Sequence, residues 1–251
     1  MSATEESGEE EEARRHEMLL KLLDEAEEQV RGGRVSEDLL ARISQLRPYE
    51  AAYFIDRLEN SLAHGWYRLD RKSFEALSKV EEAVTPKVAE YVKERFGVEV
   101  PVRASRGWTD AVIEKFKDIT VKDLSEVDEK DMDEYLLAPF PDFLEGYVSW
   151  DRFEEVLKYV PAQNFLDRQN ESPTFLDFIE AAAKVPGSYL HIYIVNKLRE
   201  DERVTIDGIL LPVNKDSGDV VREVLRDALD APDEVSFFNV KGEQYIWLWW
   251  D

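Results

Sequence analysis

The stretch VSFFNVKGEQYIWLWW, residues 235–250, decides the fold class at the C-terminal end of the chain. Two runs rich in aromatic and β-branched residues flank Lys241-Gly242, a pattern typical of a β-hairpin. In the second run, alternation places Tyr245, Trp247 and Trp249 on one face and apolar residues on the other. A strand that is apolar on both faces needs cover on both, so we expect these three side chains in the core or beneath a partner surface.

Two further patterns precede this hairpin. Apolar residues recur at helical spacing over residues 218–229, which predicts a helix. Before it, RVTIDGILLPV, residues 203–213, places Asp207-Gly208 between two β-rich arms, and Asp-Gly is a strong signal for a two-residue hairpin turn. The order hairpin, helix, hairpin predicts a small antiparallel sheet with a helix on one face, and hence an α+β protein.

The N-terminal half is predicted to be mostly helical. A first helix should stop at Gly32-Gly33, Ser36 should cap a second, and Pro48 should lie in the first turn of a third. We expect two more helices separated by a break at Pro86, because proline interrupts helical hydrogen bonding. Short connections between helices are typical of a helical bundle or array.

The composition along the chain predicts three regions. Residues 1–12 contain six Glu and no basic residue, which indicates a disordered acidic tail. Residues 13–140 form the expected helical domain, and the Pro-rich connector APFPDF marks its end. Residues 141–251 form the expected α+β domain, which ends in two β-hairpins.

Over residues 172–213, a capped helix is followed by a break at Pro186-Gly187, a second apolar pattern beginning at Ser188, and two β-rich arms. This order resembles a winged helix-turn-helix, in which the two arms would form the wing. The resemblance implies a recognition helix that presents Tyr193, Asn196, Lys197 and Arg199 to the DNA major groove. The β-branched residues over 189–196 suit a strand as well as a helix, so both assignments remain open.

The charge of the chain restricts its partners. The 251 residues include 55 acidic and 32 basic side chains, for a formal net charge of −23. This charge disfavours nucleic acid and anionic membranes unless a local patch overcomes it. The acidity itself has several open explanations: adaptation to a salty or hot cytoplasm, solubility alone, or a surface that imitates DNA or captures a basic partner. With no cysteine, no cationic and apolar leader and no apolar run of membrane-spanning length, we expect a cytoplasmic protein without membrane association.

The sequence contains none of the common catalytic or nucleotide-binding motifs. GxGxxG, GxxxxGK[ST], HExxH and GxSxG are absent, and the three His residues lie far apart in the sequence. We therefore assign no catalytic, cofactor-binding or metal-binding residue and expect no cofactor. The first hypothesis is a non-catalytic protein-interaction or regulatory module, with a protein partner or self-association. The alternatives are a winged-helix DNA-associated regulator and an enzyme whose carboxylate-based site cannot be read from the sequence.

Overall fold

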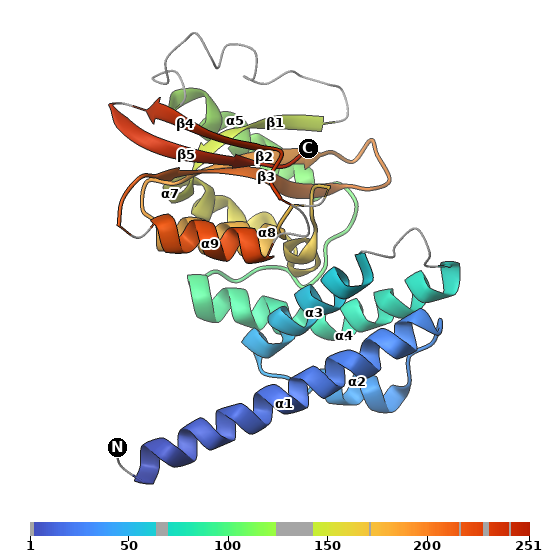
Figure 1. Ribbon diagram of the computed structural model, residues 1–251. Coiled ribbons are helices and arrows are strands. Elements are labelled where there is room, and N and C mark those ends of the chain that lie inside the picture. Colours follow the sequence, from blue (N-terminus) through green and yellow to red (C-terminus); the bar gives the residue numbers. More distant parts are fainter. Residues whose placement is uncertain are drawn as a thin grey trace. The chain divides into compact units, whose positions relative to one another are not determined.

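The computed structural model describes residues 3–63, 70–123, 143–170, 172–215, 217–227, 231–240 and 242–251. The chain divides into two compact units, Met1–Arg95 and Phe96–Asp251. The fold is α+β, with mostly helical structure in the N-terminal part and one five-stranded antiparallel sheet in the C-terminal part (Figure 1). None of the helices over the described ranges is long and apolar enough to cross a membrane.

The helical unit contains α1 (Ala3–Arg31), α2 (Glu37–Ile43), α3 (Pro48–Ala63) and most of α4 (Arg71–Phe96). Its local signals act as the sequence predicts. Gly33 takes a φ of +69° where α1 ends, and the Ser36 hydroxyl accepts a hydrogen bond from Leu39 N, 3.2 Å away, at the start of α2. Helix α1 packs against α2 and α3 through aliphatic side chains such as Leu22 and Ala26.

Two expectations about this unit are wrong. Helix α1 begins at Ala3, so the segment expected to be a disordered tail is helical from that residue onward. Glu is a good helix former, and negative charge is favourable near a helix N-terminus. Helix α4 also continues through Pro86, where a break was expected. Val80, Val84 and Val88 are buried along one face of α4 on both sides of the proline, and this packing outweighs the lost hydrogen bond.

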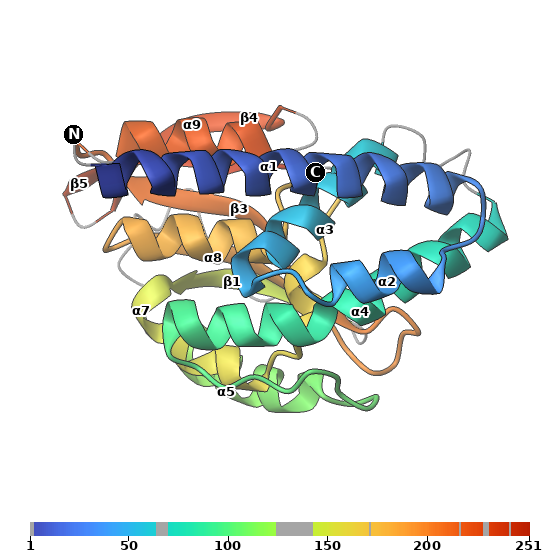
Figure 2. The same cartoon turned by 90° about the horizontal axis from the view of Figure 1, so that it is seen from below.

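The C-terminal unit is built around the sheet, whose strands lie in the order β1-β2-β3-β5-β4 (Figure 1). The strands are β1 (Phe143–Ser149), β2 (Tyr189–Val195), β3 (Arg203–Pro212), β4 (Glu234–Val240) and β5 (Glu243–Trp249). The helical segments are α5 (Thr109–Asp123), α7 (Trp150–Phe153), η2 (Glu154–Tyr159), η3 (Ala162–Leu166), α8 (Phe175–Lys184) and α9 (Ser217–Asp227). Helices α8 and α9 lie side by side, and α8 packs on β2 and β3 (Figures 1 and 2).

The division of the chain differs from the expected boundary at residues 140 and 141, which lies outside the described residues. Residues from Phe96 onward belong to the C-terminal unit. The reason is tertiary contact, because α5 packs against η2, β1 and β2 rather than continuing the helical unit. No pattern in the α5 sequence indicates whether this helix packs on the sheet or on the helices of the N-terminal unit.

The hairpin expected at residues 203–213 is not formed. Residues Arg203–Pro212 form the single strand β3, so Asp207-Gly208 is not a turn. One neighbour of β3 is the preceding strand β2, whose residues 189–195 would be a helix under the winged helix-turn-helix resemblance. Of the two assignments that the sequence leaves open for this segment, the structure has the strand, because a run of β-branched and aromatic residues is placed between two neighbouring strands and buried on both faces. The second hairpin, β4 with β5 and Gly242 in the turn, is as predicted.

Candidate functional site

The four residues predicted to contact nucleic acid lie at the end of β2 and in the loop that follows it. The Tyr193 ring stacks on Phe143 with 4.8 Å between ring centroids. The Asn196 side chain accepts a hydrogen bond from Leu198 N. Lys197 Nζ lies 2.5 Å from the carboxylate of Asp110, and Arg199 forms an ion pair with Asp201.

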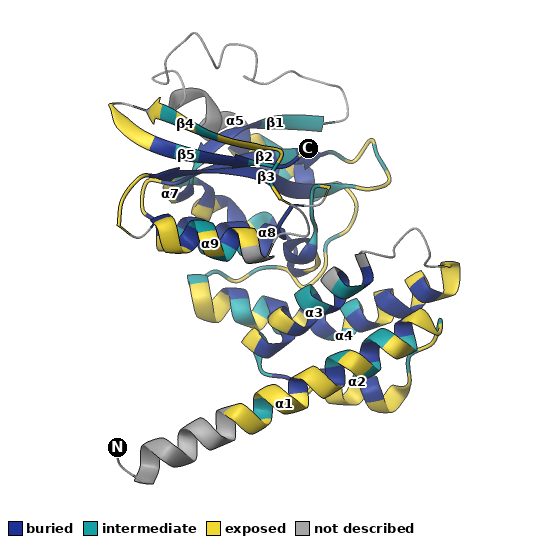
Figure 3. Cartoon of the chain, in the orientation of Figure 1, coloured by how far each residue is buried: buried dark blue, intermediate teal, exposed yellow. Residues whose placement is uncertain are grey.

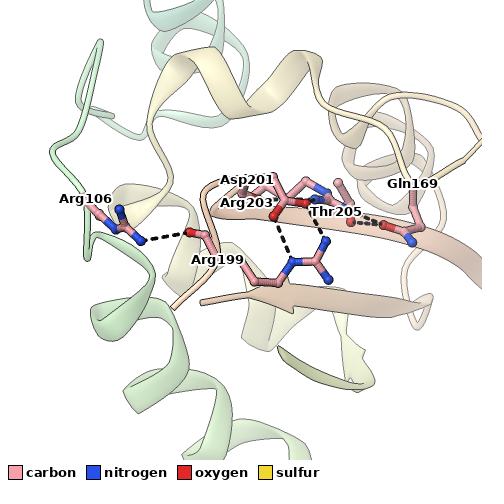
Figure 4. Close-up of polar contacts among 6 residues, drawn as sticks. All are labelled: Arg106, Gln169, Arg199, Asp201, Arg203 and Thr205. Carbon is pink, nitrogen blue, oxygen red and sulfur yellow. Dashed lines mark hydrogen bonds and ion pairs between the residues drawn. The ribbon is translucent and has the colours of Figure 1, made fainter. Parts of the chain in front are cut away.

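The loop that leads into β3 contains paired charges: Figure 4 shows Arg199 and Arg203 beside Asp201. The guanidinium groups of Arg199 and Arg203 both donate to the Asp201 carboxylate. These contacts, with the Arg199 hydrogen bond as the main cause, hold the pKa of Asp201 well below its usual range. Arg106 Nε donates to the Lys197 carbonyl oxygen at 3.0 Å and so braces the loop. Lys197, Arg199 and Arg203 are each paired with a carboxylate, so these basic side chains contribute to the structure of the loop.

The aromatic residues predicted to lie in the core or under a partner occupy one face of the sheet. Tyr245 and Trp247 of β5 are buried in a cluster, and Trp249 is half-buried against it. The Tyr245 hydroxyl donates to the Gly187 carbonyl oxygen at 3.2 Å, which satisfies its polar end. The other cluster members are Tyr147, Tyr189 and Leu210.

Gly208 permits the position of Trp247. A Cβ atom built on Gly208 would lie 2.2–2.8 Å from three ring carbons of the Trp247 indole. No larger residue fits without displacing the ring, so the glycine serves close approach rather than a turn. The Asp-Gly pair that resembles a turn signal in the sequence has a packing function in the sheet.

A buried His and Asp pair lies beside this indole. The sheet register passes from His191 opposite Gly208 to Ile192 opposite Ile206, which leaves Asp207 as the additional residue of a β-bulge. His191 Nδ1 lies 2.5 Å from Asp207 Oδ1, and the two residues are only 5% and 7% exposed. The bulge turns the Asp207 side chain toward the face that carries His191.

The second ring nitrogen of His191 is also buried. Nε2 has no hydrogen-bond partner among the described residues. An unpaired buried polar group costs about 1–3 kcal/mol and calls for an explanation. The Tyr147 ring centroid lies 4.5 Å from that of His191, and the Trp247 ring centroid lies 6.1 Å away. The sequence does not predict this site, because His191 and Asp207 meet only when β2 pairs with β3. No pattern near either residue indicates that pairing.

The outer edge of the sheet is a second candidate surface. Among the described strands, none lies beyond β4, while all seven β4 residues pair with β5 on the inner side. Val235 and Phe237, two residues apart and therefore on one face, are 54% and 63% exposed. Figure 3 shows exposed residues along β4 beside the buried central strands.

Among the described residues, no group of three or more His, Asp or Glu side chains is placed to hold a metal ion.

Comparison with family models, with curated proteins and with solved structures finds no match for this chain.

Proposed function

We propose that this protein is a non-catalytic interaction module that binds an extended segment of a basic protein partner along β4. The observation that carries the proposal is the exposure of Val235 and Phe237 on an edge strand. An edge strand presents a row of backbone N–H and C=O groups that an added strand can pair with. Exposed apolar side chains on that strand supply the cross-strand contacts that an added strand needs.

The edge lacks the usual protection against strand addition. Natural edge strands are blunted by Lys, by Pro or by a bulge, all of which hinder pairing. The β4 sequence EVSFFNV contains neither Lys nor Pro, and its register with β5 runs without a shift. These features favour a strand that accepts a partner over one that is only the end of a sheet.

The charge of the protein selects the kind of partner. Asp233, Glu234 and Glu243 lie at the end of β4 or on the paired strand, and the chain carries a net charge of −23. A second copy would bring the same negative charge and be repelled, so a basic segment is favoured over self-association. The partner segment should have apolar residues at alternate positions and Lys or Arg between them.

Titration calorimetry with a synthetic peptide of about eight residues that alternates Val and Lys tests this proposal. We expect saturable binding that Phe237→Lys weakens at least tenfold, because this change adds a charge to the apolar row and repels the peptide. Leu198→Lys is the matched control, since Leu198 is 66% exposed but lies in a loop. It makes the same change of net charge and should leave the affinity unchanged.

Two results would overturn the proposal. If Phe237→Lys and Leu198→Lys weaken binding equally, the net charge of the protein alone explains the binding. A peptide of the same composition with Val and Lys in separate blocks should bind poorly, and equal binding of this block peptide would exclude recognition by alternation. Light scattering of the protein alone distinguishes self-association, which should be absent.

A further inference from the structure

We propose that a cavity between α1 and α2 binds an aliphatic carboxylate, a small molecule with an apolar chain and an anionic head group. The cavity lies in the helical unit and has a volume of about 470 Å³. Residues of α1 line one side, and the end of α2 with the residues that follow it lines the other. The site is separate from the exposed β4 row and does not depend on strand addition there.

The size of the cavity favours a small ligand. Small-molecule sites commonly have volumes of about 300–1,000 Å³, and this cavity lies within that range. An α-helix is about 10–12 Å across and rises about 5.4 Å per turn, so about one turn would fill the same space. One turn carries few side chains for recognition, and a small molecule is therefore favoured over a docked helix.

The apolar part of the lining comes from three side chains. Leu22 and Leu46 are buried, whereas Met18 is 49% exposed and lies one helical turn from Leu22 on the same face of α1. The exposure of Met18 means that this part of the lining is open to solvent, so a ligand can reach it. The unbranched thioether chain of Met adapts readily to an apolar ligand. We expect the alkyl chain to lie along these three residues.

The lining is richer in cations than in carboxylates, although the chain has a net charge of −23. Two further carboxylates, Glu50 and Asp38, pair with lining cations from outside the cavity. Charges farther away than about 8 Å are largely screened at physiological ionic strength, so the lining decides the sign of the ligand. The cations of the lining are Arg14, Arg15, Lys21 and Arg42, and its carboxylates are Glu17 and Glu25.

Arg42 and Gln45 supply hydrogen-bond donors for the anionic head group. Arg42 Nη2 lies 2.6 Å from both carboxylate oxygens of Glu25, and Arg42 Nε lies 3.0 Å from Asp38. Arg42 Nη1 and the Gln45 side-chain amide make no hydrogen bond within the described ranges of the chain. Guanidinium and amide N–H groups both donate to a carboxylate, and the guanidinium bond is charge-assisted. The ion pair of Arg42 with Glu25 is exposed and contributes little stability, so it can give way to a ligand.

Two probes with the same alkyl chain and opposite charge, octanoate and octylammonium, test the proposal on the full chain. The net charge of the protein alone would favour octylammonium, so the order of the two affinities separates the site from general attraction. We expect octanoate to bind at least about tenfold more tightly, equivalent to about 1.4 kcal/mol. NMR of ¹³C-labelled Met methyl groups measures the binding, because the chain has three Met and Met18 lines the cavity. Met18→Leu identifies the resonance.

A substitution and its control connect the binding to the cavity. Arg42→Gln removes the guanidinium and should weaken octanoate binding about tenfold without weakening octylammonium. Arg71→Gln is the matched control, because Arg71 also forms an exposed ion pair, with Glu75, but lies on α4 outside the lining. It makes the same change of net charge and should leave the affinity unchanged. Circular dichroism establishes that both variants are folded.

Butyrate tests the apolar part of the site. It carries the same carboxylate on a chain shorter by four carbons, and we expect it to bind at least about tenfold more weakly than octanoate. Three results would overturn the proposal: octylammonium binding as tightly as octanoate, equal weakening by Arg42→Gln and Arg71→Gln, or a Met18 shift that stays linear with octanoate concentration. Each would reduce the interaction to nonspecific contact with an amphipathic molecule.

Discussion

The two units each bury a carboxylate, and they treat it differently. Glu50, in the first turn of α3, is 3% exposed and accepts two hydrogen bonds from Arg15 and one from the backbone N–H of Arg47, all at 2.8 Å. Asp207 is nearly as buried, and the side chain bonded to it is His191, which keeps a second unpaired nitrogen. Glu50 therefore has strong partners for its carboxylate, whereas the partner of Asp207 retains a ring nitrogen without a hydrogen bond among the described residues.

This difference concerns how completely each buried carboxylate and its partner are hydrogen-bonded. Glu50 closes the N-terminus of α3 in the manner of a capping box and meets a bidentate cation, so its role is complete within the fold. Replacing a buried pair such as His191 and Asp207 by apolar residues of similar size is often neutral or stabilising, because desolvation can exceed the gain from a single contact.

The largest effect is expected at Gly208, which positions the sheet around the pair. Gly208→Ala places a methyl group inside the Trp247 ring and should lower the free energy of unfolding by about 3 kcal/mol. Gly218→Ala is the matched control: a Cβ there meets nothing within 4 Å, and the protein should be at least as stable. Chemical denaturation measures both variants. Equal stability would show that the indole does not lie over Gly208.

The next effect tests the satisfied carboxylate. Arg15→Met leaves Glu50 buried without its cation, and we expect a loss of about 2–3 kcal/mol, less than for a fully buried pair because Arg15 is partly exposed. Arg42→Met removes the exposed ion pair with Glu25 and should cost less than about 1 kcal/mol. Urea denaturation of the two variants compares them directly. Similar losses would mean that Glu50 has no special structural role.

A smaller effect is expected when the whole polar pair is replaced. The double change His191→Leu with Asp207→Leu should leave stability within about 1 kcal/mol of the wild type, or raise it. His191→Leu alone leaves a buried carboxylate without a partner and should be clearly destabilising. Thermal unfolding of the single and double variants measures the coupling. A double variant that is less stable than either single variant would make the pair structural, like Glu50.

The smallest effect concerns a third carboxylate, Glu81 of α4. Burial, followed by the nearby charge of Glu82, raises the pKa of Glu81 above its usual 4.5. The fold therefore favours the protonated form, and stability is lost as the pH rises through the raised pKa. Glu81→Gln should stabilise the protein by up to about 1 kcal/mol near neutral pH and have no effect below the usual pKa. Urea denaturation at both pH values measures this, with Glu94→Gln, exposed on the same helix, as control. Equal gains from the two substitutions would contradict the assignment.

The contrast between two glycine signals shows how far the sequence can be read. Lys241-Gly242 and Asp207-Gly208 both stand between β-rich runs of the sequence, but Gly242 lies in a turn and Gly208 lies within β3. Gly242 has a φ of +85°, as a tight turn requires, whereas Gly208 lies within a strand because the Trp247 ring covers it. A turn depends on backbone conformation near the glycine, while that packing depends on a residue 39 positions away.

The same limit applies to the candidate sites. Alternation in the last strand correctly groups Tyr245 with Trp247, since period-two alternation is local. The composition does not predict that Phe237 is exposed and Trp247 is buried, because both residues belong to apolar runs of the same hairpin. Strand order decides the difference: among the described strands, β5 lies between two neighbours and β4 has one.

By itself the sequence determined the features that depend on neighbouring residues: the end of α1 at Gly33, the cap of α2 at Ser36, the C-terminal hairpin and the α+β class. Only the tertiary structure decided that Asp207 would meet His191, that β2 would be a strand and that α4 would pass through Pro86. The physical reason is the range of the forces involved. Capping and turn formation are settled within about one turn of chain, whereas register and burial depend on segments that become neighbours only in the folded sheet and helical unit.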